Sequence, residues 1–153
     1  MATFIDITDS ENLFHLLSGL KADTLPSWGR LRAQSMVEHL IENVQATNGK
    51  IMATLAESPE DALREKQQKV LTDFIIPRNA GGFSPDATKT TKYKDLDTAI
   101  KQLMEELQDF HEYFGVEGRT AIHPGFGPMN YHEWIVWHGK HFTHHFRQFG
   151  LIE

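Results

Sequence analysis

The chain of 153 residues contains no cysteine. This absence excludes disulfide bonds, thiolate metal sites and a cysteine nucleophile, and it is compatible with a cytoplasmic protein. The sequence also lacks a run of about 20 apolar residues, the length that a membrane span requires. Its first ten residues, MATFIDITDS, lack the basic region and apolar block of a secretory signal. We therefore expect a cytoplasmic protein with no membrane segment.

Basic charge is scarce as well. Lysine and arginine number 15 against 21 aspartates and glutamates, which gives a net charge of −6, and the basic residues are scattered. Nucleic acid is therefore excluded as a main partner, because neutralising its phosphates requires a basic surface. The length fits a single domain over residues 1–153, and no internal repeat divides it.

No segment alternates between apolar and polar residues over the length of a strand. Apolar residues instead recur at helical spacing. Four long segments show this pattern: residues 8–21, 31–55, 95–114 and 130–150. A shorter, very polar helical pattern covers 58–74, and 77–92 reads as a long irregular loop. The sequence therefore predicts an all-α fold with four principal helices and a short connector helix, which would bury their apolar stripes as a four-helix bundle.

The last predicted helix holds five of the nine histidines. Asn130 and Glu133 have the spacing of a capping box at its start, and Gly150 suits its end. A helical wheel places His141 and His145 on the inward, aromatic face, and it places Lys140 and Thr143 on the opposite, polar face. The sequence thus predicts one buried face and one solvated face for this helix.

His141 and His145 are four residues apart, so their rings project from the same face one turn apart. Two imidazoles at this spacing can hold one divalent ion. The spacing alone leaves open a second interpretation, in which both are core histidines bonded to their neighbours. A third ligand from another helix would distinguish the two.

His39, on the second long helix, is the candidate third ligand. The connection over 58–94 is long enough to cross the bundle, which would give up-down-down-up directions with the second helix antiparallel to the last. At ~1.5 Å per residue, His39 then lies ~9 Å from Ala33, taken as the start of its helix, and His141 and His145 lie ~12 and ~6 Å from Phe149, taken as the end of theirs. The three rings would meet at one level. Up-down-up-down directions would instead separate them.

The same residues resemble those of a known family. His39 lies in MVEHL, within the block WGRLRAQSMVEHL, and His141 and His145 lie in HFTHH, which follows the run HPGFGPMNYHEW. This pattern is similar to the DinB-like (YfiT-like) family of four-helix-bundle proteins, regarded as metalloenzymes, and to an uncharacterised bacterial subgroup within it. The resemblance extends from Trp28 to Gly150. It implies that His39, His141 and His145 bind a metal ion.

Three neutral imidazoles leave open positions on a divalent ion, as in catalytic sites. Zinc is the first expectation, and nickel, iron and manganese also suit imidazole ligands. The resemblance implies a metal-dependent enzyme acting on a small-molecule substrate, because characterised relatives include thiol S-transferases and a mycothiol-dependent isomerase. We expect a hydrolase or a transferase that uses a low-molecular-weight thiol. The alternative is a non-catalytic helical bundle that binds a small ligand or forms a homodimer.

The sequence leaves the roles of three further residues near the candidate site open. His138 could ligate in place of His145 or act behind it, and His144 is expected to make a hydrogen bond. Glu42, one turn after His39, could orient water, although a surface carboxylate fits its position equally. No residue is assigned as the general base.

Overall fold

The computed structural model describes residues 3–78 and 90–153. These ranges contain five helices and a two-stranded sheet: α1 (Ser10–Ser18), α2 (Ala33–Gln45), α3 (Pro59–Lys69), α4 (Leu96–Tyr113), β1 (Ala121–His123), β2 (Gly127–Met129) and α5 (Tyr131–Gln148). The predicted, mostly helical fold is confirmed, with a small hairpin added. Most of the predicted loop 77–92 lies outside the described residues. Of the described helices, none combines the length and apolar character that a membrane crossing requires.

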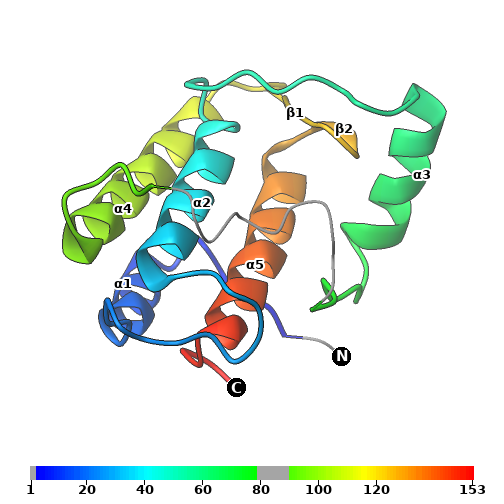
Figure 1. Cartoon of the computed structure of the whole chain (residues 1–153). Coiled ribbons are helices and arrows are strands. Elements are labelled where there is room, and N and C mark those ends of the chain that lie inside the picture. The colour runs from blue at the N-terminus through cyan, green and yellow to red at the C-terminus, as the bar shows by residue number, and fades with distance from the viewer. Residues whose placement is uncertain (1–2, 79–89) are drawn as a thin grey trace.

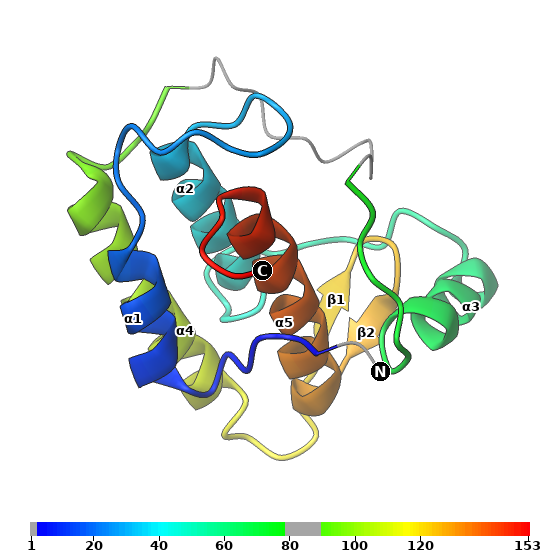
Figure 2. The ribbon, with the colours of Figure 1, turned by 90° about the horizontal axis from the view of Figure 1, so that it is seen from below.

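Helices α1, α2, α4 and α5 lie together, and α3 stands apart beyond the hairpin (Figure 1). The colours of Figure 1 show that α2 and α4 run in the same direction and that α5 runs against them. Seen from below, α5 lies between the α1–α4 side and the hairpin (Figure 2). Because α2 ends at the top of Figure 1 and α4 begins at the bottom, the chain between them returns along the length of the helices.

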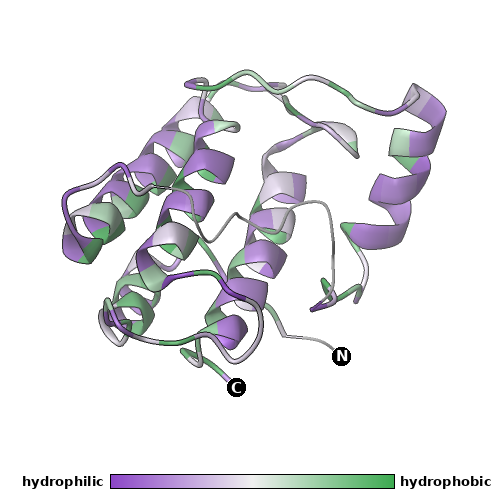
Figure 3. Ribbon diagram, viewed as in Figure 1, coloured by the Kyte–Doolittle hydropathy of each residue, from purple (hydrophilic) through white to green (hydrophobic). Residues whose placement is uncertain are grey.

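The core is formed where these four helices face one another. Its fully buried members include Leu13, Leu17, Met36, Leu40, Ile41, Leu103, Phe110, Phe142 and Phe146. Helix α3 is largely hydrophilic (Figure 3), and Ala62 is its buried residue. This agrees with the prediction of a solvated connector.

Side-chain caps fix the starts of four helices. Asp9 accepts a hydrogen bond from the backbone of α1, Ser58 does so for α3, and Asp95 for α4. Asn130 and Glu133 form the predicted capping box of α5. Such caps satisfy backbone N–H groups that have no partner within the helix. The helix starts were therefore predictable from local sequence.

The end of α2 differs from the prediction. The helix ends at Gln45 rather than at Leu55. The Thr47 hydroxyl donates to the carbonyl three residues earlier at 2.7 Å, and Gly49 adopts a positive φ of 87°. Both features turn the chain out of the helix. Ile51, which the prediction included in this helix, lies beyond its end and is 44% exposed.

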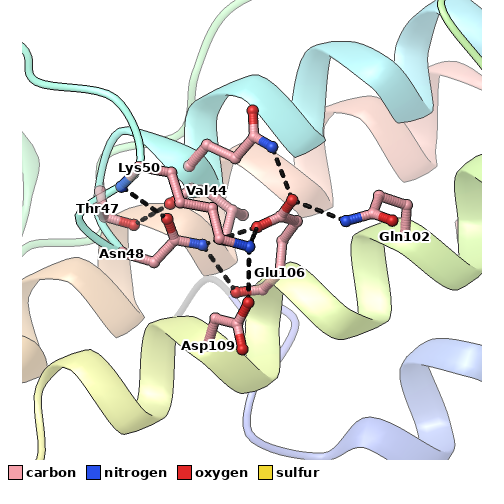
Figure 4. Close-up of polar contacts among 8 residues, drawn as sticks. Val44, Thr47, Asn48, Lys50, Gln102, Glu106 and Asp109 are labelled. Carbon is pink, nitrogen blue, oxygen red and sulfur yellow. Dashed lines mark hydrogen bonds and ion pairs between the residues drawn. The ribbon is translucent and has the colours of Figure 1, made fainter.

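A buried carboxylate holds the turn after α2 against α4 (Figure 4). Glu106 is 1% exposed. It accepts hydrogen bonds from Gln45 (2.6 Å), Asn48 (3.0 Å), Lys50 (2.6 Å) and Gln102 (2.9 Å). Burial alone would raise the pKa of Glu106, but these hydrogen bonds outweigh it and the pKa is lowered. Four donors therefore compensate the burial of this charge.

The hairpin occupies the segment that contains HPGFG. β1 and β2 pair antiparallel, with Ile122 opposite Pro128. Each strand has three residues, so the alternation of apolar and polar residues is too short to be recognised in the sequence. The backbone N–H of Gly125 donates to His123 Nδ1 at 2.9 Å, and the His123 ring stacks on Phe126. His123 therefore holds the tip of the hairpin in place.

The predicted polar face of α5 is wrong at two positions. Lys140 and Thr143 are each 1% exposed. The backbone N–H of Ile5 donates to the Thr143 hydroxyl at 2.8 Å, so the N-terminal segment covers this side of the helix. The Lys140 ammonium donates to three main-chain carbonyl oxygens, of Lys69 (2.9 Å), Thr72 (2.7 Å) and Phe74 (2.9 Å). Helix α5 is therefore covered on both sides.

Candidate metal centre

The structure brings His39, His141 and His145 together. The Nε2 atom of His141 lies 3.0 Å from that of His39 and 3.1 Å from that of His145. One nitrogen from each ring can be chosen so that all three lie within 4.8 Å of one another. At tetrahedral angles, zinc–nitrogen bonds of ~2.0–2.1 Å place ligand nitrogens ~3.3–3.4 Å apart. Two of the separations are thus within ~0.4 Å of those around a single ion.

The two contributing helices run in opposite directions (Figure 1), as the sequence analysis required for a common level. His141 and His145 lie one turn apart on α5, and His39 faces them from α2. His145 is 5% exposed, whereas His39 and His141 are only half-buried. The group is therefore buried on one side and accessible on the other.

The hydrogen bonds of His145 select a tautomer suited to metal binding. Its Nδ1 lies 2.8 Å from Gln148 Oε1, and Gln148 Nε2 donates to the main-chain oxygen of Trp28 at 3.1 Å. The second bond fixes the orientation of the amide, so Nδ1–H of His145 is the donor in the first. A neutral imidazole then carries its lone pair on Nε2, the atom that faces His141.

The Nε2 atom of His141 is close to the Nε2 atoms of both His39 and His145. A single proton on this Nε2 would have to be shared between the nitrogens of His39 and His145, whereas one cation accepts a lone pair from each of the three rings. The donor set therefore fits a divalent ion better than a chain of hydrogen bonds.

Asn43 bears on the tautomer of His39. Its Nδ2 donates to the His39 main-chain oxygen at 2.8 Å and lies 3.3 Å from Nδ1 of the ring. This orientation favours a lone pair on Nδ1. Metal binding through Nε2 requires Nδ1–H, so the Asn43 amide nitrogen, which cannot accept this proton, must then move away from the ring.

Burial keeps His141 and His145 neutral. Burial, together with the nearby His39, lowers the pKa of His145 to about 3. Burial also holds the pKa of His141 well below its usual range, with contributions from His145 and His39. At neutral pH both rings are uncharged, which is the form that binds metals.

One comparison identifies the family. The model of a family described as "Protein of unknown function (DUF1569)" matches residues 69–150, just over half of the chain. The chain belongs to this family. The matched segment of this DUF1569 protein contains His141 and His145, while His39 precedes it. No curated protein and no solved structure gives a significant match. The family description names no function, so the geometry of the site must supply one.

His138 lies outside the three-histidine group of the DUF1569 protein. It is 1% exposed, and its Nε2 lies 3.0 Å from the hydroxyl of Thr47. Its ring packs between Phe110 and Trp134, and burial lowers its pKa to about 3. In the part of the chain that the structure describes, the group whose ring nitrogens lie close enough to share an ion contains His39, His141 and His145 but not His138.

The two remaining candidates have other partners. His144 hydrogen-bonds to the main chain of Ile76 and packs edge-on against Trp28, as expected for a histidine outside the ligand set. Glu42 forms an ion pair with Lys92 at 3.3 Å, and its side chain is 34% exposed. The surface interpretation of Glu42 fits this position.

Sequence analysis missed Gln148, which orients His145. Its main-chain oxygen also accepts a hydrogen bond from the backbone N–H of Ser27 at 2.7 Å. Ser27 and Trp28 are thus tied to the end of α5, near the histidines. The i,i+3 spacing between His145 and Gln148 was the one available signal.

Glu38 was missed as well. This residue, next to His39, is 8% exposed. Its carboxylate accepts from the backbone N–H groups of Lys92 (2.7 Å) and Tyr93 (3.3 Å) and from Gln34 Nε2 (3.0 Å). The carboxylate therefore holds the entry to α4 against α2 beside the candidate ligand.

Proposed function

We propose that this protein is a metal-dependent enzyme whose divalent ion is bound by His39, His141 and His145. The observation that supports this most directly is the approach of three Nε2 atoms from two antiparallel helices. The second ring nitrogen of His145 is already bonded to Gln148, as in metal sites whose ligands are oriented by neighbouring groups. Three protein ligands leave positions for water or substrate, which is the arrangement of a catalytic site.

The proposed reaction is hydrolysis of a small molecule or transfer of a low-molecular-weight thiol to one. When bound, the ion would supply Lewis acidity and a lowered pKa for a water or thiol ligand. His39 and His141 are partly exposed and would lie on the side of the ion that a water or thiol ligand can reach. His145 is buried. Zinc is the first choice, and nickel, iron or manganese would suit the same ligands.

We also propose that α1, α2, α4 and α5 form a four-helix bundle of the DinB-like kind. The directions of α2, α4 and α5 in Figure 1 support this arrangement, with a long connection between α2 and α4. The contribution of one histidine by α2 and of a pair by the last helix supports it too. The length of the connection predicts the first feature, and the resemblance implies the second.

The test is the metal content of untagged protein, measured by mass spectrometry. We expect near-stoichiometric metal that is lost in His39→Ala and His145→Ala and retained in His144→Ala. The last variant is a matched control, because His144 is the direct neighbour of His145 but lies outside the group. A wild-type protein that neither contains metal nor is stabilised by zinc, nickel, iron or manganese would refute the proposal and favour a non-catalytic helical module.

Further assays can then distinguish hydrolysis from thiol transfer. Loaded protein would be assayed with ester substrates, and with an electrophile in the presence of small thiols. Anomalous scattering at the metal edge in crystals soaked with a thiol would show whether its sulfur occupies an open position. Sulfur on the metal supports the transferase, whereas ester turnover without any thiol requirement supports the hydrolase.

A further inference from the structure

A pocket flanks the candidate metal centre on another side of α5. Its volume is about 220 Å³. Its lining includes Phe4, Trp28, Ile76, Arg78, Arg147 and Glu153. None of the three metal-ligand candidates lines it. Since a water molecule takes up ~30 Å³ in the liquid, the pocket suits a small molecule rather than a drug-sized one.

The charge in this pocket is opposite to that of the whole chain. Three cationic side chains line it, Arg78, Lys140 and Arg147, against the acidic Glu153, although the protein has a net charge of −6. Lys140 contributes charge but donates its protons to main-chain oxygens. Hydrogen bonds to a ligand would therefore come from the two arginines. This excess of positive charge favours the binding of an anion in the pocket.

Both arginines are held in position. The guanidinium carbon of Arg78 lies 4.4 Å from the centroid of the Trp28 ring. Nε–H of Arg147 donates to the main-chain oxygen of Glu153 at 2.9 Å. A guanidinium stacked on an aromatic face keeps its N–H groups in its own plane, where they bind carboxylates and phosphates through paired hydrogen bonds.

We propose that this pocket binds a small organic anion, independently of the metal centre. A carboxylate or phosphate group would lie against Arg78 and Arg147, and an apolar body of about one ring would contact Phe4 and Ile76. The mixed lining of cationic and apolar side chains supports a ligand with both characters. This site goes beyond the proposed enzymatic function and requires no metal.

Calorimetry on the full chain tests the proposal with two anionic probes, benzoate and phenyl phosphate, and with neutral benzamide. We expect saturable binding of at least one anion, with benzamide about tenfold weaker or worse. Arg78→Gln and Arg147→Gln should each weaken the anion about tenfold or more. Arg119→Gln is the matched control, because its guanidinium also lies over an aromatic ring, 4.3 Å from that of Tyr113. This variant should bind as the wild type does.

Chelation separates this site from the metal centre. Binding that survives treatment with EDTA and the His145→Ala substitution but weakens in both arginine variants supports the pocket. Binding that disappears on chelation and persists in the arginine variants places the anion on the metal, which overturns the pocket while supporting the enzyme. Absence of saturable binding by either anion also overturns the pocket. The stronger of the two probes identifies the preferred anionic group.

Discussion

Replacing Gln148 by leucine tests whether hydrogen bonding to His145 prepares the metal ligand. The change keeps the size of the side chain and removes its amide. His145 Nδ1 then loses the acceptor at 2.8 Å, and the Trp28 carbonyl loses its donor at 3.1 Å. The bond from Ser27 to residue 148 involves the main chain and survives. Water is a poor substitute, because Gln148 is 6% and His145 5% exposed.

The expected effect is a shift in tautomer. Without an acceptor at Nδ1, the proton of His145 is no longer held there, and the form with Nε2–H gains population. That form cannot bind a metal through Nε2. Loss of such an outer hydrogen bond weakens metal binding ~10–100-fold, which corresponds to ~1.4–2.7 kcal/mol. The metal-free protein should lose ~1–2 kcal/mol of stability, because a buried donor is left without a partner.

Competition against a chromophoric chelator for zinc measures this affinity. Gln148→Glu, which keeps an acceptor at the same place, should bind at least as tightly as the wild type. Gln102→Leu serves as the matched control, because it removes a glutamine bonded to Glu106 on α4. It should lower stability but leave zinc affinity unchanged. Wild-type affinity in Gln148→Leu would refute the orienting role of Gln148.

Three further substitutions address stability. Glu106→Gln should lower the free energy of unfolding by ~2–3 kcal/mol at neutral pH. Because the folded-state pKa of Glu106 is lowered, its contribution to stability is present above the unfolded pKa and is lost as the pH falls through the folded pKa. Urea unfolding should therefore show the stabilities of the variant and the wild type converging in acid. Gly139→Ala places a Cβ 2.5 Å from the carbonyl oxygen of Ile5, and the ~1–3 kcal/mol of overpacking should exceed the ~1 kcal/mol gained in helix propensity, which would lower the melting temperature followed by circular dichroism. Lys140→Met removes the donor to three carbonyl oxygens, one at the end of α3 and two in the segment after it, so we expect a loss of ~3 kcal/mol and faster amide exchange in residues 69–76.

Local signals predicted the helix starts, because a cap such as Asp95 needs only the next three residues. The end of α2 was not predictable from apolar periodicity. Ile51 continues the stripe, but Thr47 and Gly49 turn the chain before it. The strands of the hairpin are too short to show a period. Periodicity reports the average face of a segment and contains little information about where it stops.

The candidate site was predictable to the extent that it depends on helix geometry. The spacing of His141 and His145 predicted two of the ligands, and antiparallel packing against α2 predicted His39 as the third. The burial of Lys140 was not predictable, because it depends on which remote segments return to cover α5. The same holds for Gln148, whose amide is fixed by a carbonyl far away in the sequence.

His39 and His141 are 102 residues apart in the sequence, yet their Nε2 atoms lie within 3.0 Å. An ion bound to both would staple together a loop of that length in a chain that has no disulfide. Closing a loop of ~100 residues removes the equivalent of ~4–5 kcal/mol of entropy from the unfolded chain. Loss of the ion would then weaken the attachment of α2 to α5 first, while Glu106 would still fasten the turn after α2 to α4.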